Sequence, residues 1–246
     1  LLDALLVIAK QNEKGMAVLS WERAKEQYGV TMPVVRAMEE KGIVKLESMR
    51  IYRDPLDLMI SRSNQKQEEV KMQTGRDFFL NEEQQLAVQT ILKEWDQKDK
   101  SVYLLHGVTG SGKTEVYMEL IDFVRKQGKQ AIFLIPEIAL TYQMVLRFYQ
   151  RFGSRVSILH SRMSAGERYD QYEKAKNGEI DIMIGPRSAL FTPFSNLGLI
   201  IVDEEQEGAY NSEQIPRYHT RETADKLAQL TNSLLLLGSA TPSIES

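Results

Sequence analysis

The sequence predicts an α/β protein with an open parallel sheet and helices on both faces, preceded by a small helical domain. Two observations lead to this fold class. From residue 78 onward, short apolar runs alternate with segments of helical spacing, which is the pattern of a parallel sheet covered on both sides. Before it, a polar stretch at 61–77 has the composition of a linker. We therefore expect a small domain at 1–60, a linker at 61–77 and the α/β domain at 78–246.

The composition of the 246 residues is that of a globular chain, with 42% hydrophobic and 26% charged residues. There is no cysteine, which excludes disulfides and thiolate metal sites within this sequence. No apolar run reaches membrane-spanning length and no signal peptide opens the chain, so we expect no membrane contact and a cytoplasmic location. A net charge of -3 argues weakly against nucleic-acid binding by the overall field, but leaves room for a local basic surface.

The small domain has the outline of a winged helix, because three helical segments precede two β-prone runs. We expect the helices at 1–9, 19–27 and 31–41, and the β-prone runs at 43–46 and 50–53. Thr31 is the expected N-cap of the third helix, and Gly42 ends it. Such an outline allows DNA contact through the third helix, or a scaffold or protein-contact role. The third helix mixes basic with acidic residues, which favours the second role.

The stretch Gly107–Thr114 fits the phosphate-binding pattern G-x-x-x-x-G-K-[ST] at every fixed position. The apolar run 102–105 before it predicts a buried strand, and 114–127 after it has helical spacing that ends at Gly128. Strand, loop and helix in this order are the context that the motif requires. The alternative, a flexible Gly/Ser surface loop, does not account for these flanking elements.

The chemistry of this loop suits a Mg²⁺–nucleotide. Its glycines allow successive backbone N–H groups to point at one phosphate. Lys113 would meet the β- and γ-phosphates, and the Thr114 hydroxyl would ligate Mg²⁺. We therefore expect ATP to be held by seven residues of the loop, namely Gly107, Thr109, Gly110, Ser111, Gly112, Lys113 and Thr114.

A helix is expected to open near Leu80, with Asn81 as its N-cap and Gln84 completing a capping box. Gln84 has a second interpretation. Many nucleotide-driven motors place a glutamine just upstream of this strand, where its amide donates to and accepts from the adenine edge. The two interpretations do not exclude each other.

Beyond the loop, strands are expected at 131–135, 156–159, 180–184, 197–202 and 234–237, and helices at 141–152, 164–176 and 220–230. Ser164 and Glu167 form a second capping box. The run 197–202 is almost entirely apolar, as a central parallel strand should be. Ligands of such sheets bind at the carboxyl ends of the strands, where the phosphate-binding loop, Asp203 and Gly238 all fall.

Three acids, Asp203, Glu204 and Glu205, directly follow this apolar strand. In a chain with a phosphate-binding loop they indicate a Walker B motif. Asp203 would hold Mg²⁺ directly or through water, and Glu204 would polarise the attacking water as a general base. Glu205 has no assigned role and is expected to be solvated.

The segment Gly238–Pro242 again follows an apolar strand. Its small hydroxyl residues can hydrogen-bond both the Walker B acids and a nucleic-acid strand. The alternative is an ordinary turn at the end of a strand.

These three sites in this order resemble superfamily-two helicases, whose catalytic lobes are RecA-like. Within these, the chain resembles the bacterial primosomal replication-restart helicases, densely over residues 78–246. The motifs that carry this resemblance are GVTGSGKTEVY (107–117), PEIALT (136–141), LHS (159–161), GPRSALFTPF (185–194), DEE (203–205), RYHTR (217–221) and GSATPS (238–243).

The resemblance implies a DNA-dependent ATPase and helicase of 3′-to-5′ polarity that acts at stalled forks. It implies ATP and Mg²⁺ as cofactors, and as partners single-stranded and forked DNA, primosome proteins and single-strand-binding proteins. By matching position, 136–141 and 185–190 would face single-stranded DNA, with Arg187 near a phosphate and Ser188 beside it. The loop 207–221 would report DNA binding to the ATP site, and its Tyr210 and Tyr218 would either stack on bases or pack the loop.

Two departures from the family pattern stand out. Gln206 occupies the position that usually holds histidine, which puts the coupling between ATP and DNA in doubt. The family also has a second lobe with an arginine finger and a cysteine-rich zinc module. The leucine at position 1, within a helical segment, suggests a piece of a longer protein, and we expect this piece alone to turn over little ATP. The alternatives are another P-loop ATPase, or a DNA- or protein-binding module with an incomplete nucleotide site.

Overall fold

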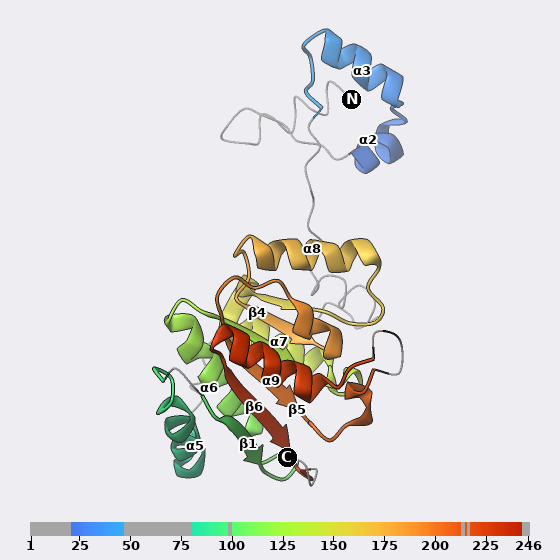
Figure 1. Cartoon of the computed structure of the whole chain (residues 1–246). Coiled ribbons are helices and arrows are strands. Elements are labelled where there is room, and N and C mark those ends of the chain that lie inside the picture. The colour runs from blue at the N-terminus through green and yellow to red at the C-terminus, as the bar shows by residue number, and fades with distance from the viewer. Residues whose placement is uncertain (1–20, 47–79, 98–99, 213–214, 216, 243–246) are drawn as a thin grey trace. The chain divides into compact units, whose positions relative to one another are not determined.

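A computed structural model describes residues 21–46, 80–97, 100–212, 215 and 217–242 (Figure 1). The chain divides into two compact units, Leu1–Ile51 and Tyr52–Ser246. The domain boundaries expected at residues 60 and 77 fall outside the described residues and stay predictions. In the described part of the chain, no helix has the length and apolar character needed to cross a membrane.

The first unit contains α2 (Trp21–Tyr28) and α3 (Met32–Glu40), which confirm the second and third expected helices. Each is followed by a glycine of positive φ, Gly29 and Gly42. Helices commonly end at such a glycine, because it adopts the left-handed conformation without strain. The run 43–46 forms no strand; the backbone N–H of Leu46 donates instead to a carboxylate oxygen of Glu39. The expected helix at 1–9 and the run at 50–53 lie outside the described residues, so the winged helix stays a prediction.

The second unit is built on a six-stranded parallel sheet of strand order β1-β6-β5-β2-β4-β3. Each expected strand is present within two residues of its expected ends. The strands are β1 Val102–His106, β2 Gln130–Leu134, β3 Val156–Ile158, β4 Ile182–Gly185, β5 Leu197–Asp203 and β6 Leu234–Ser239. The expected fold class of this unit is confirmed.

Helices cover both faces of the sheet, and a separate apolar core fills each side (Figure 1). One core packs α5, α6 and α7 against the sheet, and the other packs α8, α9 and η3. The helices are α5 Glu82–Leu92, α6 Lys113–Lys126, α7 Tyr142–Phe152, α8 Ala165–Lys176 and α9 Thr220–Thr231, with 3₁₀ turns η1 Glu137–Ala139, η2 Gly153–Arg155, η3 Arg187–Phe191 and η4 Gly208–Tyr210. Both expected capping boxes, at Asn81 and Ser164, are formed.

The expectation that the run 102–105 is a buried strand is wrong. β1 lies at the edge of the sheet and pairs only with β6. Alternate side chains are therefore exposed, Val102 by 47% and Leu104 by 38%. A four-residue apolar run does not distinguish a central strand from an edge strand with one covered face. In contrast, β5 is buried along its whole length between β6 and β2, as expected.

The register of the sheet brings the three expected motifs to one edge. Asp203 at the end of β5 is paired with Gly238 of β6, and His106 of β1 is paired with Ser239. The backbone N–H of Gly107 then donates to the carbonyl of Ser239. The phosphate-binding loop, the acids and the segment after β6 therefore lie side by side, although Asp203 comes 96 residues after Gly107 and Gly238 comes 35 residues after Asp203.

The edge position of β1 can be tested with a pair of leucines. Leu236 of β6 is fully buried, whereas Leu104 of β1 is partly exposed. We expect Leu236→Ala to cost about 2–5 kcal/mol of unfolding free energy, because it opens a cavity in the core. Leu104→Ala should cost less than about 1 kcal/mol, near the range of surface substitutions. Urea denaturation measures both, and equal costs would place β1 inside the sheet instead.

Candidate active site

The loop before α6 is shaped by glycines at positions that other residues would strain. Gly110 and Gly112 have φ of +82° and +84°, and Gly112 is the N-cap of α6. A Cβ at Gly112 would lie 2.3 Å from the Gln84 side-chain nitrogen. The positive φ favours glycine here, and any other residue would also displace the side chain of Gln84 from its contacts with the loop.

A cavity of about 430 Å³ opens over this loop. It is lined by Gln84, Val108, Thr109, Gly110, Ser111, Gly112, Lys113, Thr114, Glu115, Arg147, Asp203 and Glu204. All the expected nucleotide-binding residues except Gly107 line it, and so do both expected Walker B acids. Gly107 contributes its carbonyl, which accepts a hydrogen bond of 2.6 Å from the ammonium group of Lys113. The structure therefore brings the two sequence motifs together around one cavity.

Gln84 joins α5 to the loop. Its side-chain oxygen accepts from the backbone N–H of Asn81 at 3.0 Å, which completes the capping box. Its side-chain nitrogen donates to the carbonyls of Ser111 at 3.2 Å and Gly112 at 3.5 Å. The capping interpretation is confirmed, and the same amide also holds the loop. An adenine contact by Gln84 stays a prediction.

The carboxylate of Asp203 is held in a nearly closed setting, with the residue 9% exposed. The Tyr117 hydroxyl donates to Asp203 Oδ1 at 2.9 Å, and the Tyr210 hydroxyl donates to the Asp203 carbonyl at 2.7 Å. Burial raises the pKa of Asp203, and the neighbouring charge of Glu204 adds to this, although the Tyr117 hydrogen bond and Lys113 act in the opposite direction. A cation at this carboxylate would offset the penalty of keeping its charge buried.

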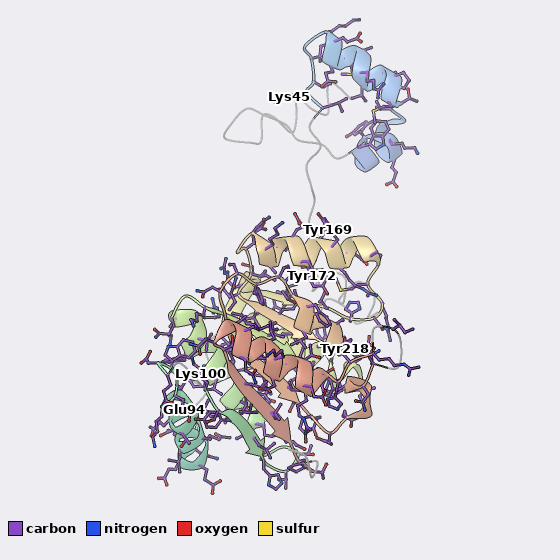
Figure 2. All side chains as sticks on the ribbon, viewed as in Figure 1. Lys45, Glu94, Lys100, Tyr169, Tyr172 and Tyr218 are labelled. Carbon is purple, nitrogen blue, oxygen red and sulfur yellow. The ribbon has the colours of Figure 1, made fainter. Side chains whose placement is uncertain are left out.

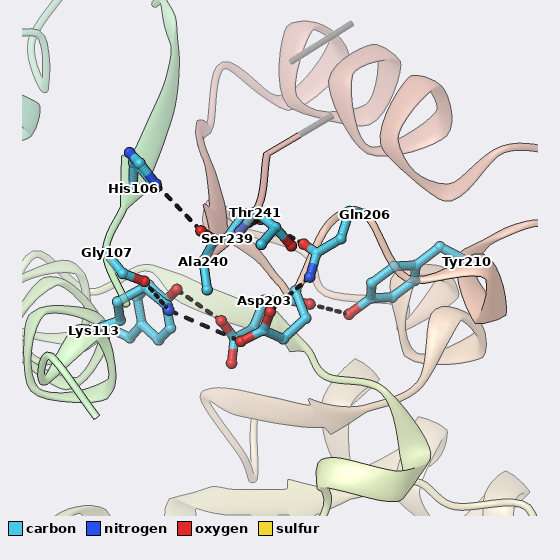
Figure 3. A network of polar contacts seen from close by, with 11 residues as sticks. His106, Gly107, Lys113, Asp203, Gln206, Tyr210, Ser239, Ala240 and Thr241 are labelled. Atoms are coloured by element: carbon cyan, nitrogen blue, oxygen red, sulfur yellow. Dashed lines mark hydrogen bonds and ion pairs between the residues drawn. The ribbon is translucent and has the colours of Figure 1, made fainter. Parts of the chain in front are cut away.

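A chain of polar contacts connects Glu204 through Gln206 to the segment after β6, and Figure 3 labels Gln206, Ser239 and Thr241 of this chain. The Gln206 amide donates to Glu204 Oε2 at 2.8 Å, and its oxygen accepts from the Ser239 hydroxyl at 2.5 Å. The backbone N–H of Thr241 in turn donates to Ser239 Oγ. The reverse amide orientation would place an oxygen against the Glu204 carboxylate, so these partners determine how Gln206 lies. Glutamine therefore supplies a donor to Glu204 at the position where the family usually has histidine.

Glu204 also faces Lys113 across the cavity, with 3.9 Å between Oε1 and the ammonium nitrogen. Its backbone lies in the left-handed region, at φ +49°, which is uncommon for a residue other than glycine. The tight turn that results lets the next residue, Glu205, donate its backbone N–H to the Gly238 carbonyl. Strain of this kind is found where a side chain must be aimed at a site.

The expectation that Glu205 is solvated is wrong. The residue is 4% exposed, and one of its carboxylate oxygens lies 3.9 Å from Arg221 of α9. Its side chain does not line the cavity, because β5 ends at Asp203 and the left-handed turn at Glu204 redirects the chain. Glu205 therefore helps to attach α9 rather than to line the site.

Three residues of the cavity wall, Val108, Glu115 and Arg147, were not among the expected site residues. Arg147 comes from α7 and forms an ion pair with Glu115 of α6, and both line the cavity. Glu115 lies within the motif at 107–117 but had no assigned role, whereas Arg147 belongs to no recognised motif and α7 begins some 30 residues after the loop. Only the packing of α7 beside α6 on the same face of the sheet brings Arg147 to the site.

The four residues expected to contact DNA lie in different settings. Arg187 donates to the carbonyls of Ala209 and Asn211 in the loop after β5, and the Ser188 carbonyl accepts from the Tyr172 hydroxyl at 3.2 Å. Tyr218, labelled in Figure 2, packs edge-on against Phe191, with ring centroids 5.3 Å apart. Phe191 itself is 55% exposed.

Tyr210 is only 2% exposed, and its hydroxyl is bonded to Asp203. For this residue the structure favours the packing interpretation over base stacking. Its position nevertheless connects the loop after β5 directly to the Walker B acid.

A family model described as DEAD/DEAH box helicase matches residues 81–246. The chain belongs to the DEAD/DEAH box helicase family. It is 40% identical over 245 residues, 99% of its length, to the replication restart protein PriA of Bacillus subtilis, and 49% identical over 168 residues, 68% of its length, to that of Chlamydia trachomatis. It spans 29% and 22% of these two relatives. A solved structure of RecG bound to a three-way DNA junction is 21% identical, with a TM-score of 0.51 over 98% of this chain and 27% of that one; this likeness shows the fold.

Membership of this family implies the use of ATP and Mg²⁺. The described residues fit both. They contain no group of three or more His, Cys, Asp or Glu side chains that could hold a metal alone, but Mg²⁺ in nucleotide sites is usually bound by one or two carboxylates together with phosphates. Asp203 supplies such a carboxylate at the wall of the cavity, which the hydroxyl-bearing Thr114 also lines.

The two roles of Gln84 can be separated with its capping partner. Asn81→Ala removes the capping bond from the Gln84 backbone N–H and leaves the contacts of Gln84 with the loop. Gln84→Ala removes the other capping bond, from the Asn81 backbone N–H, and the contacts with the loop. Each variant should lose about 1 kcal/mol of stability. Only Gln84→Ala should weaken ADP binding, measured by calorimetry. If Asn81→Ala weakens ADP binding to the same degree, the contacts of Gln84 with the loop do not matter for the nucleotide.

Proposed function

We propose that this chain is the ATP-binding lobe of a DNA-dependent ATPase and 3′-to-5′ DNA helicase that acts in replication restart. The observation that carries the proposal is the placement of Glu204 opposite Lys113 across the cavity, 3.9 Å away, beside the buried Asp203. A phosphate-binding lysine, a metal-holding acid and a second acid for water are the parts that ATP hydrolysis needs. The similarity to replication restart proteins supports the biological setting.

Within the site, each residue has a separate task. The backbone N–H groups of Gly107–Thr114 and the Lys113 ammonium group hold the phosphates. Thr114 and Asp203 would hold Mg²⁺, which would neutralise part of the phosphate charge. Glu204 accepts a proton from the attacking water, and its hydrogen bond from Gln206 keeps the carboxylate aimed into the cavity. Gln84 lies beside the loop, where its side-chain amide is the proposed contact for the edge of adenine when nucleotide is bound.

On the DNA side, we assign single-stranded and forked DNA to the edge of the sheet where β2 and β4 end. Arg187 and Ser188 of η3 lie there, and Tyr218 packs against the exposed Phe191. A cationic side chain beside an exposed aromatic ring suits a backbone phosphate and an unstacked base. Primosome and single-strand-binding proteins as partners, a zinc module elsewhere in the longer protein and a cytoplasmic location complete the proposal, on the basis of family resemblance.

Nucleotide binding is tested by removing the lysine of the loop. Lys113→Ala should weaken Mg²⁺–ADP binding at least about tenfold, roughly 1.4 kcal/mol, in calorimetry of this chain. Lys126→Ala is a matched control. Lys126 is the last residue of the same helix, α6, where it forms an ion pair with Asp122. Equal ADP affinity in Lys113→Ala and the control would contradict the assignment.

The separate roles of Asp203 and Glu204 are tested by replacing each carboxylate with its isosteric amide in the full-length protein. Asp203→Asn should weaken nucleotide binding in Mg²⁺, because it removes the charge that meets the metal. Glu204→Gln should leave nucleotide binding intact and lower DNA-stimulated hydrolysis by at least about a hundredfold, the size of a lost general base. If both variants lose nucleotide to the same degree, the two roles are not divided in this way.

A further inference from the structure

Tyr117 is buried and is the last residue of the motif at 107–117, but no role has been assigned to it. It lies in the second turn of α6 and is 0% exposed. Its ring packs against Phe133 of β2, with centroids 5.5 Å apart, and its hydroxyl donates to Asp203 Oδ1 at 2.9 Å. The hydroxyl of a tyrosine is protonated at neutral pH, so Tyr117 is the donor and the carboxylate oxygen of Asp203 is the acceptor.

The surroundings of this ring would accept phenylalanine. They belong to the apolar core on the α6 side of the sheet. A hydroxyl buried among apolar groups is tolerated only when it is hydrogen-bonded, and the partner here is a carboxylate oxygen that lies at the cavity. The hydroxyl therefore has a specific use at Asp203, which the packing of the ring alone does not require.

Gly238 makes room for this contact. A Cβ at this position would lie 1.8 Å from the Tyr117 hydroxyl oxygen and 3.1 Å from Asp203 Oδ1. Gly238 does not have a positive φ, so its backbone conformation is open to any residue. The glycine is required because the space next to Asp203 in the sheet register is filled by the hydroxyl from α6.

We propose that Tyr117 is a positioning residue for magnesium, which holds the Asp203 carboxylate in the orientation that binds the metal, and that Gly238 is the glycine that admits it. This inference rests on the proposed role of Asp203. A carboxylate has about four acceptor positions, and Asp203 uses some of them for Tyr117 and the backbone N–H of Glu204. The torsion of an aspartate carboxyl group is soft, so these donors determine which oxygen faces the cavity.

The test is Tyr117→Phe, which removes one oxygen atom and keeps the ring. ADP affinity of this chain is measured by calorimetry over a range of Mg²⁺ concentrations and in EDTA. We expect the Mg²⁺ concentration for half-maximal enhancement of ADP binding to rise about tenfold, the lower end of the effect of losing a group that orients a metal ligand. Affinity in EDTA should not change. Tyr172→Phe is the matched control, since it also removes a hydroxyl that donates to one acceptor, the Ser188 carbonyl, away from the cavity.

Gly238→Ala provides an independent variant, because its methyl group would displace the hydroxyl from Asp203. It should show the same loss of ADP affinity, confined to conditions with Mg²⁺, even if Tyr117→Phe does not fold. An unchanged Mg²⁺ dependence in Tyr117→Phe would overturn the proposal. An equal loss of ADP affinity with and without Mg²⁺ would also overturn it, because Tyr117 would then only shape the cavity. If the unaltered chain binds no ADP, the proposed nucleotide site fails instead, and that result is distinguishable from both.

Discussion

The buried carboxylate of Asp203 constrains the residues around it. A charged group with 9% exposure at the end of a central strand is costly unless donors or cations compensate it. Tyr117 supplies one donor from α6, and Tyr210 holds the backbone of the same residue from the loop after β5. The contact with Tyr117 requires a glycine on the neighbouring strand, at Gly238. Three segments far apart in sequence are therefore fitted to one carboxylate.

The parallel sheet makes this arrangement possible. Because all six strands run in the same direction, their carboxyl ends meet at one edge. The phosphate-binding loop follows β1, the acids follow β5 and the hydroxyl-bearing segment follows β6, and these strands are neighbours in the order β1-β6-β5. The hydrogen bonds from Gln206 to Glu204 and from Ser239 to Gln206 then join the second and third motifs. The loop that carries Tyr210 also contacts Asp203 directly, which supports the proposed coupling between DNA and the ATP site.

Much of this site was predictable from sequence, because its signals are local. The loop motif with its flanking strand and helix, the acids after an apolar run and the capping boxes each depend on short spacings. Sequence did not show which strand lies at an edge, since β1 is as apolar as a buried strand. It also did not show that Glu205 is buried against Arg221, or that Tyr117 and Arg147 reach the site. These contacts depend on how helices pack across the sheet, which leaves no pattern within a single segment.

The central claim is that Asp203, oriented by Tyr117, is the point where metal and protein meet. A crystal structure of this chain with Mg²⁺ and ADP would test it most directly. The account predicts phosphates at the backbone N–H groups of Gly107–Thr114, Mg²⁺ beside Asp203, and the Tyr117 hydroxyl still bonded to Asp203 Oδ1. A metal held elsewhere, or an Asp203 carboxylate turned away from Tyr117 when the metal is bound, would contradict it.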